Sequence, residues 1–374
     1  MAGLETAIGS AVNCLVYARA VPSTVQIGEH KIGVGHPCFV IAEVGVNHNG
    51  DVELAHRLVD VAADIGADAV KFQTFTPELL AAPTAPKAEY QTARDEAPNQ
   101  AAMLRNLALS RADHEALKAH AESRGLVFLS SVFDLLSLQL LDDLNVLAIK
   151  VPSGELTNLE LLAKVAATGR PVIMSTGMAT LVDVETAMAQ FHDQAGVVIL
   201  HCVSDYPAAP ADSNLRAMDT LRERFGVPVG WSDHTAGAAI APAAVALGAD
   251  VIEKHLTLDT RMPGPDHAAS LEPAAFEAMV VAIREVQSAL GSGQKMPTAS
   301  ERVMADVARK SLHWNRDLQP GDLIADGDFV ALRPGTGIPP SEGPLLLGRR
   351  VRKPTRRATL VRTEEIEPTA NRST

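Results

Sequence analysis

Two lysines stand inside otherwise apolar stretches of this chain, Lys71 in Val70-Lys71-Phe72 and Lys150 in Ile149-Lys150-Val151. A lysine is rarely buried without a partner, so each ammonium group calls for an anion or an acidic side chain nearby. Hydroxyl side chains that could bind the same anion recur in similar surroundings: Ser131, Ser153, Ser175 and Ser232. This combination is typical of a site for a phosphate and a carboxylate. The alternative is that each lysine is only paired, or reaches solvent along an apolar surface.

Two histidines also follow short apolar runs, His234 in Trp231-Ser232-Asp233-His234 and His255 in Glu253-Lys254-His255. Imidazole suits divalent transition metals, and water or carboxylate oxygens could complete the coordination. If the two runs are neighbouring strands, both rings can reach one ion. Two histidines that are hydrogen-bonded independently of each other remain the alternative.

The elements that must position these residues alternate regularly. Eight short apolar runs are separated by amphipathic segments of helical length, such as residues 52–65 and 159–167. The alternation predicts a parallel sheet, and eight units in about 250 residues predict a closed (β/α)8 barrel, an α/β TIM barrel. A doubly wound open sheet is the alternative, but no glycine-rich dinucleotide motif follows the first strand. The expected strands are residues 39–46, 68–75, 127–132, 147–152, 171–176, 197–203, 228–232 and 251–256.

Further segments flank the barrel. Residues 1–24 carry no clear pattern and stay unassigned, and residues 25–37 predict an N-terminal β-hairpin at the bottom of the barrel. The barrel domain is expected to span 25–290 and to end with a helix over 273–290. A linker is expected over 291–308, because glycine, serine and proline are frequent at its start. A small, mostly β domain follows over 309–367, with a tail over 368–374.

Composition excludes several classes of protein. The net charge of −12 argues against a general nucleic-acid binder. The three cysteines form no CxxC pair, so a disulfide framework or a cysteine-bound zinc site is not expected, and a reducing cytoplasm fits best. The longest uncharged run, near residues 235–249, is too short to span a bilayer, so no membrane association is expected.

Seven segments, in order along the chain, resemble motifs of the sialic acid synthases. An eighth, LRPGTGI at residues 332–338, is similar to the signature of the antifreeze-like (SAF) domain that these enzymes append. The resemblance runs from about residue 25 to residue 367. The seven segments are IAEVGVNHNG (41–50), VKFQTF (70–75), KVPSGE (150–155), STGM (175–178), WSDHT (231–235), EKH (253–255) and GPD (264–266).

The resemblance implies a phosphoenolpyruvate-dependent synthase. Such an enzyme joins phosphoenolpyruvate to the open-chain aldehyde of an N-acetylated amino sugar, here N-acetylmannosamine first, and releases phosphate by C–O cleavage. It implies Mn²⁺ or Mg²⁺ on His234 and His255, and a domain-swapped homodimer in which Arg333 reaches the partner's sugar. Glu155 is the first candidate for general base and Glu43 the second. The other implied contacts are phosphoenolpyruvate with Lys71, Ser131, Lys150, Ser153, Ser175, Ser204 and Ser232, and the sugar with Glu43, Gln73, Tyr206 and Asp266, of which Glu43 and Asp266 are also expected to be catalytic.

Other functions remain open at this point. The same chemistry on a diacetamido-6-deoxy-mannose would give legionaminate, and a third sugar would give pseudaminate. A barrel aldolase could instead form a Schiff base on Lys71 or Lys150, although this leaves the histidine pair without a role. A sugar- or ice-binding protein that is not an enzyme would leave the polar strand ends unexplained.

Overall fold

A computed structural model describes residues 24–92, 94–191 and 196–368 of the chain. The described residues form two compact units, one up to Gly291 and one from Ser292, and each is described by itself. The unassigned N-terminal segment and the tail lie outside the described residues, apart from Thr24 and Pro368. No helix within the described residues combines the length and hydrophobicity needed to cross a bilayer.

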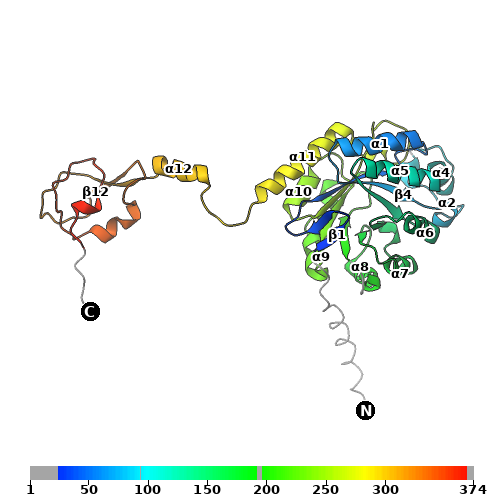
Figure 1. Cartoon of the computed structure of the whole chain (residues 1–374), viewed down its shortest axis with the longest axis horizontal. Coiled ribbons are helices and arrows are strands. Elements are labelled where there is room, and N and C mark those ends of the chain that lie inside the picture. The colour runs from blue at the N-terminus through cyan, green and yellow to red at the C-terminus, as the bar shows by residue number, and fades with distance from the viewer. Residues whose placement is uncertain (1–23, 93, 192–195, 369–374) are drawn as a thin grey trace, which may run out of the picture. The chain divides into compact units, whose positions relative to one another are not determined.

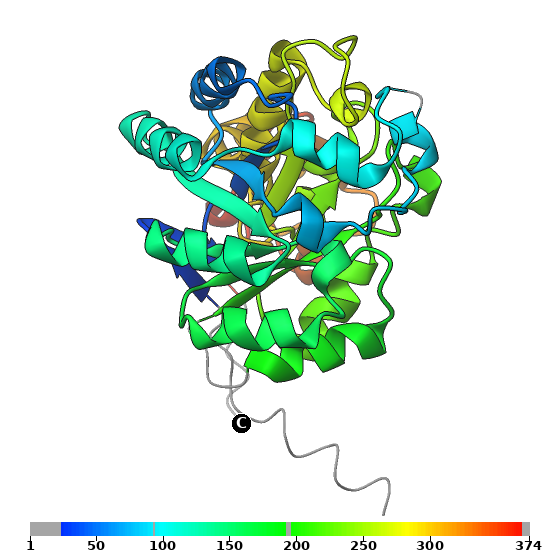
Figure 2. The same cartoon turned by 90° about the vertical axis from the view of Figure 1, so that its right-hand side faces the viewer.

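The first unit is built around a closed barrel of eight parallel strands, as the alternation predicts (Figures 1 and 2). Around the barrel the strands follow one another in chain order, and the last pairs with the first through register pairs such as His255 with Glu43. Nearly every strand residue is buried, as expected when helices cover the outer face of a parallel sheet. The strands are β3 (Phe39–Gly45), β4 (Ala69–Thr74), β5 (Val127–Val132), β6 (Ile149–Val151), β7 (Val172–Ser175), β8 (Val197–Cys202), β9 (Val229–Asp233) and β10 (Val251–His255).

Helices cover the outside of the barrel. The first begins where Asp51 accepts hydrogen bonds from the backbone N–H groups of Glu53 and Leu54, a standard N-cap. Outward-facing strand residues such as Val40 and Phe72 belong to one apolar core with helix residues. The helices are α1 (Val52–Asp64), α5 (Arg111–Ser123), α6 (Leu135–Asp143), α7 (Leu159–Ala167), α8 (Leu181–Met188), α9 (Ala217–Phe225), α10 (Ile240–Ala246) and α11 (Pro273–Leu290), with short 3-10 helices η1 (Ser153–Glu155), η2 (Ala189–Phe191), η3 (Pro210–Asp212) and η4 (His267–Ala269).

The N-terminal hairpin closes one end of the barrel. Strands β1 (Thr24–Ile27) and β2 (His30–Gly33) are antiparallel, and Val25 and Ile27 are fully buried among inward-facing residues of the barrel strands. Gly196, just before β8, lies so close to Val25 that a Cβ there would be 2.8 Å from its side chain. The hairpin therefore fills the N-terminal end of the barrel and leaves the carboxyl ends of the strands open.

Three short helices that the sequence analysis did not predict lie between β4 and α5: α2 (Pro77–Leu80), α3 (Glu89–Thr92) and α4 (Gln100–Leu107). They form a small apolar core of their own, in which Met103, Leu104 and Leu107 pack with Phe75. The backbone N–H of Gly264 donates to the carbonyl oxygen of Arg94, which ties this segment to the loop after β10.

The second unit has its own core, and part of the expected linker is helical. Residues 299–308, assigned above to a linker, form the helix α12 (Ala299–Ala308). Thr298 and Glu301 cap each other's backbone N–H groups in a capping box, which starts a helix despite the glycine-rich residues before it. Beyond it, β11 (Ser311–Trp314) pairs with β12 (Phe329–Leu332) over a core that includes Trp314, followed by the short 3-10 helices η5 (Pro340–Leu346) and η6 (Thr363–Glu365).

Candidate active site

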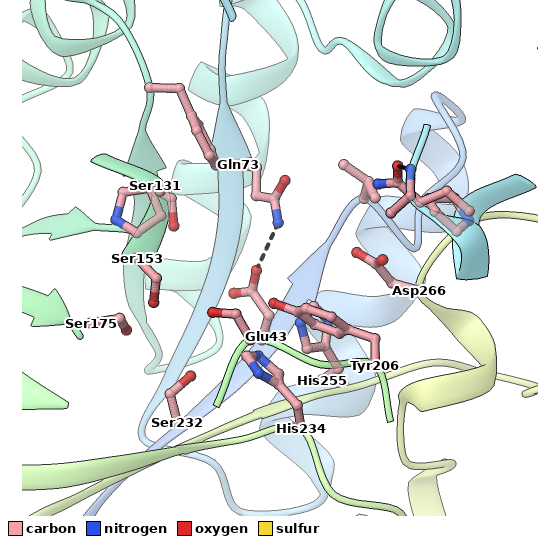
Figure 3. Close-up of a pocket in the computed structure, with 18 of the residues that line it drawn as sticks. Glu43, Gln73, Ser131, Ser153, Ser175, Tyr206, Ser232, His234, His255 and Asp266 are labelled. Carbon is pink, nitrogen blue, oxygen red and sulfur yellow. Dashed lines mark hydrogen bonds between the residues drawn. The ribbon is translucent and has the colours of Figure 1, made fainter. Parts of the chain in front are cut away.

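A cavity of about 430 Å³ opens at the carboxyl ends of the barrel strands (Figure 3). This is the end of a (β/α)8 barrel where the strands deliver functional side chains. Of the fifteen residues that the sequence analysis assigns to the site, the structure brings together all but two. They are Glu43, Lys71, Gln73, Ser131, Lys150, Ser153, Ser175, Ser204, Tyr206, Ser232, His234, His255 and Asp266.

Lys71 sits at the centre of a buried charge cluster. Its Nζ lies 2.6 Å from Glu43 Oε2 and 3.8 Å from Glu253 Oε2, and it donates to Ser131 Oγ at 2.9 Å. Burial alone would lower the pKa of Lys71, but the two carboxylates outweigh it and hold that pKa above its ordinary value. Lys71 is therefore a permanent cation, and it is paired with acidic side chains as its apolar strand requires.

Lys150 shares one of these carboxylates. Its Nζ lies 3.8 Å from Glu253 Oε1 and donates to Ser175 Oγ at 2.6 Å. Ser232 Oγ donates to the same Glu253 oxygen at 3.0 Å. Burial lowers the pKa of Lys150 and is only partly offset by Glu253. The nearest carboxylate oxygen is 3.8 Å away, so a bound anion in closer contact would stabilise the charged form of Lys150 further.

The pKa values of Glu43 and Glu253 are shifted in opposite directions. Burial raises the pKa of Glu43 to about 7, against the attraction of Lys71. Burial would also raise the pKa of Glu253, but the ammonium groups of Lys150 and Lys71 outweigh it and hold that pKa below its usual range. Glu253 is thus a fixed negative charge, whereas Glu43 can gain and lose a proton near neutral pH, the property of a general acid or base.

Glu43 is held in place by an irregular end of β3. The register between β3 and β4 shifts between Glu43 and Gly45, and Gly45 adopts φ = +56°, which favours glycine. A Cβ at Gly45 would lie 3.0 Å from Glu43 Oε1 and 3.4 Å from His255 Cε1. Gln73 Nε2 also donates a hydrogen bond to Glu43 Oε1, at 3.5 Å. A side chain at position 45 would therefore crowd the carboxylate of Glu43 and strain the backbone.

Ser153 and Ser204 line the cavity where the backbone of Gly177 lies against their hydroxyl groups. The backbone N–H of Gly177 donates to Ser153 Oγ at 2.9 Å. A Cβ at Gly177 would come within 2.2 Å of Ser204 Oγ and 2.8 Å of Ser153 Oγ. The glycine of the STGM segment therefore makes room for both hydroxyl groups on the serine side of the cavity.

The histidines converge as their places on neighbouring strands predict. The ring centroids of His234 and His255 are 5.5 Å apart. His234 Nδ1 donates to the carbonyl oxygen of Val203 at 2.7 Å, which leaves Nε2 with a free lone pair. His255 Nδ1 is buried without a hydrogen-bond partner. The pair fits a divalent metal held by two imidazoles, and water or substrate oxygens would have to complete the shell, because no group of three or more suitable side chains occurs among the described residues.

Tyr206 and Asp266 form the opposite side of the cavity. The ring of Tyr206 lies 4.1 Å from that of His234, measured between centroids. Asp266 is 7% exposed, and burial raises the pKa of its carboxyl to about 6. In Figure 3, Ser131, Ser153 and Ser175 lie on one side of Glu43, with Tyr206 and Asp266 on the other. The cavity thus has a side rich in hydroxyl groups and a side with an aromatic ring and a buried carboxyl group.

The structure does not bring Glu155 into the cavity. Its carboxylate accepts a hydrogen bond from Asn158 Nδ2 at 2.8 Å and lies at the end of η1, outside the lining residues. Glu155 and Glu43 both stay candidates for the general base, and only Glu43 lines the cavity. Arg333 belongs to the second unit, where it is exposed and donates to the carbonyl oxygen of Ala308 at 3.0 Å.

Three contributors were missed. Glu253 stands two residues before His255 on β10, so strand alternation places both on the inner face, and that signal was present in the sequence. Cys202, at the end of β8, lines the cavity beside them. The third contributor is the α2–α4 segment, with lining residues that no strand pattern could have indicated: Leu80, Ala88, Tyr90, Gln91, Gln100, Met103, Leu104 and Leu107.

Comparisons with known proteins give matches over most of the chain. The sequence model of the NeuB family matches residues 58–295, and that of the SAF domain matches residues 309–367. The chain is 44% identical to the N,N'-diacetyllegionaminic acid synthase of Legionella pneumophila over 90% of this chain and 96% of that protein. It is 35% identical to the human N-acetylneuraminate-9-phosphate synthase, over 86% and 90%. The crystal structure of the N-acetylneuraminic acid (sialic acid) synthetase of Leptospira borgpetersenii in complex with citrate superposes with a TM-score of 0.68 at 33% identity, covering 76% of this chain and 96% of that one.

Proposed function

This chain belongs to the NeuB family of nonulosonate synthases, and on that premise we propose that it condenses phosphoenolpyruvate with the open-chain aldehyde of an N-acylated amino sugar, releasing phosphate. One observation carries the proposal: two buried lysines, each bonded to a serine, share a cavity with a titratable carboxyl group and a pair of histidines. Few reactions need a strong anion site, a base near neutral pH and two imidazoles within one cavity of this size.

Phosphoenolpyruvate would occupy the hydroxyl-rich side. Lys71 and Lys150 supply two buried positive charges, and the serines around them supply donors for phosphate and carboxylate oxygens. The carboxylates of Glu43 and Glu253 hold the ammonium groups in position before the substrate arrives. A site organised in this way stabilises charge without reorganising during the reaction.

The chemistry then follows from the substrate. C3 of the enol ester attacks the aldehyde carbon, a C–C bond forms, and C2 gains positive character. The π electrons of the C=O bond move to the aldehyde oxygen, which becomes a hydroxyl group by taking the proton that Glu43 removes from water in the next step. Water adds to C2, and its proton goes to the carboxylate of Glu43, whose pKa of about 7 suits a base at neutral pH. The C2–O bond to phosphate breaks, the hydroxyl group on C2 gives its proton to the departing phosphate, and C2 becomes a ketone. Phosphate leaves with the bridging oxygen, and the two lysines stabilise its charge.

We propose Mn²⁺ or Mg²⁺ as the cofactor, held by His234 and His255. The bound ion would act as a Lewis acid on the carbonyl oxygen of the aldehyde. The support is the anchored tautomer of His234 and the buried Nδ1 of His255 without a partner.

For the sugar, we propose the diacetamido-6-deoxy-mannose that leads to legionaminate. The motifs alone placed N-acetylmannosamine first, but the relative at 44% identity is named for N,N'-diacetyllegionaminic acid. Within the described residues, the cavity has no lysine or arginine other than Lys71 and Lys150, so a sugar phosphate would lack a second cationic site in the barrel unit. Because phosphoenolpyruvate is made in the cytoplasm, we expect the reaction to take place there.

We further propose a homodimer in which the second unit of one chain covers the barrel of the other. Within its unit α12 buries no residue, and it leaves Val303, Met304 and Val307 more than 60% exposed. Such an apolar stripe on a helix favours contact with another surface. In this arrangement Arg333 would donate to the sugar of the partner chain.

The experiment is a phosphate-release assay with manganese, phosphoenolpyruvate and either sugar. Phosphate should appear only when a sugar is present, and a nine-carbon acid should accumulate in equal amount. The Lys150→Ala variant, tested at the same concentrations, controls for contaminating phosphatase. Phosphate release that is independent of the sugar, or none with either sugar, would overturn the proposal.

A further inference from the structure

The three-helix segment between β4 and α5 supplies a wall of the cavity to which the proposed reaction assigns no role. Five apolar or aromatic residues of this segment line the cavity, and we call them the α2–α4 wall: Leu80, Tyr90, Met103, Leu104 and Leu107. Met103, Leu104 and Leu107 are at most 7% exposed although they border the cavity. They therefore back the wall, while the partly buried Leu80 and Tyr90 present its surface to the cavity.

The position of the new C–C bond in the cavity determines which part of the sugar lies against the α2–α4 wall. If the anion occupies the lysines and serines, the new C–C bond forms near Glu43 and the histidines, at the middle of the cavity. The aldehyde carbon must then lie there, and the rest of the sugar extends away from Ser131, Ser153 and Ser175 toward the side of Tyr206 and Asp266 (Figure 3). The distal end of the sugar then comes next to Tyr90, the wall residue whose ring stacks on that of Tyr206.

Tyr90 links the wall to the reacting centre. Its ring stacks on that of Tyr206 with centroids 5.2 Å apart and planes 24° apart, and Tyr206 in turn packs on His234. Burial raises the pKa of Tyr90, and the negative charge of Asp266 adds to this, so the phenol stays neutral. The stacked rings form a continuous aromatic surface from the histidine pair out to the wall, against which an acylamido plane or an apolar carbon can lie.

The wall is also fixed in position. Lys87 Nζ, nearly buried, donates to the backbone oxygen of Asp95 at 2.5 Å and pairs with its carboxylate at 3.1 Å. The hydrogen bond from Gly264 to Arg94 joins the same stretch to the loop that carries Asp266. A preorganised wall can discriminate between substrates, because it does not rearrange to suit the wrong one.

We propose that the α2–α4 wall selects the sugar, with Tyr90 stacking on its distal half and Leu80 contacting its terminal carbon. An apolar contact of this kind accepts a terminal methyl group and disfavours a hydroxyl or phosphate group, which would lose its water there. The chemical class that the wall takes is thus a 6-deoxy sugar. The inference rests on the proposed function and assigns its selectivity to residues outside the barrel strands.

The test compares kcat/KM for diacetamido-6-deoxy-mannose with kcat/KM for N-acetylmannosamine in the full-length protein with manganese. Leu80→Asn places an amide in the wall, and Leu79→Asn makes the same change at the neighbouring position, which is 58% exposed and outside the lining. Leu80→Asn should lower the ratio of the two kcat/KM values roughly ten-fold, the typical worth of one apolar group in a pocket. Leu79→Asn should leave the ratio unchanged.

Tyr90 is tested in parallel. Tyr90→Ala should raise the KM for the diacetamido sugar roughly ten-fold while the KM for phosphoenolpyruvate stays constant, and Tyr90→Phe should retain most of the affinity because it keeps the ring. Thermal melts identify a variant that has lost its fold, and Leu80→Asn and Tyr90→Ala each test the wall without the other. The inference would be refuted if folded Leu80→Asn kept the ratio of the two kcat/KM values and folded Tyr90→Ala kept the KM for the diacetamido sugar. The proposed function would not be affected by this result. A wild-type protein that releases no phosphate with either sugar would refute the proposed function and the inference together.

Discussion

Replacing Glu43 by glutamine removes a carboxyl group that the barrel buries beside Lys71 and Glu253 but leaves a side chain of the same shape. Burial raises the pKa of Glu43 from its ordinary value of 4.5 to about 7. In the unfolded chain the group returns to its ordinary pKa. The folded protein therefore holds a proton on Glu43 at pH values where the unfolded chain has already released it.

The sign and size of the effect follow from linkage. Because the folded state binds more protons between pH 4.5 and about 7, the free energy of unfolding falls as pH rises through this window. A shift of this size corresponds to a loss on the order of 3 kcal/mol once the pH is well above 7. The variant lacks this titration, so its stability relative to the wild type should increase by about that amount between about pH 5 and about pH 8.5.

Urea unfolding in the presence of a chelator measures this difference. The chain has two tryptophans, Trp231 buried in β9 and Trp314 in the core of the second unit. A Trp314→Phe background leaves Trp231 as the only tryptophan, so fluorescence reports the barrel alone. Glu223→Gln, which removes an exposed carboxyl group on α9, is the matched control for the loss of one carboxyl group.

The reasoning fails if Glu43→Gln and wild type keep a constant stability difference over this range. It also fails if the variant becomes relatively less stable as pH rises, because Glu43 would then titrate below its ordinary pKa as a simple partner of Lys71. Either outcome would remove Glu43 as a base near neutral pH.

Three further predictions concern the other parts of the site. Lys71→Ala and Lys150→Ala should each raise the KM for phosphoenolpyruvate or lower kcat, by the 10- to 100-fold that corresponds to about 1.5–3 kcal/mol for a lost charge-assisted contact. Chelation should abolish activity and manganese should restore it, while His234→Ala and His255→Ala should weaken manganese binding measured by calorimetry. Mixing Arg333→Ala subunits with Lys150→Ala subunits should give more activity than either variant alone, because a mixed dimer holds one site with both residues intact.

Each of these has an outcome that contradicts it. Wild-type kinetics for phosphoenolpyruvate in both lysine variants would exclude the anion site. Full activity in excess chelator would exclude a metal-assisted reaction. For the mixing test, differential tags must first show that subunits have exchanged. Confirmed mixed dimers with no gain in activity would then mean that Arg333 serves its own barrel or none.

The barrel could be predicted because its periodic signals are local. Each strand is an apolar run of a few residues, and the helices α7 and α11 begin and end where the sequence predicts. The strand ends were predicted less well. The fourth strand covers only Ile149–Val151 of the expected 147–152, and half-exposed Leu147 lies outside it, because pairing with the neighbouring strands sets the limits rather than apolarity.

In the candidate site, strand alternation predicts the residues on strands but not those outside them. Alternation along β10 places Glu253 and His255 on one inner face, so these residues could be expected to meet. His234 follows directly after the last residue of the neighbouring strand β9. Glu155 lies beyond the end of its strand on a short 3-10 turn, where alternation no longer sets the direction of a side chain. The α2–α4 wall depends on tertiary packing of helices as short as four residues, which leave no periodic pattern to read.

The central claim is that this cavity joins phosphoenolpyruvate to an amino sugar by breaking the bond between C2 and its oxygen. The most direct measurement uses phosphoenolpyruvate labelled isotopically in the oxygen that bridges C2 and phosphorus, with the diacetamido sugar and manganese, followed by mass spectrometry of both products. The account predicts that the label leaves entirely with phosphate and that an unlabelled nine-carbon acid forms in equal amount. Label retained in the acid, or phosphate that forms without any nine-carbon acid, would contradict it.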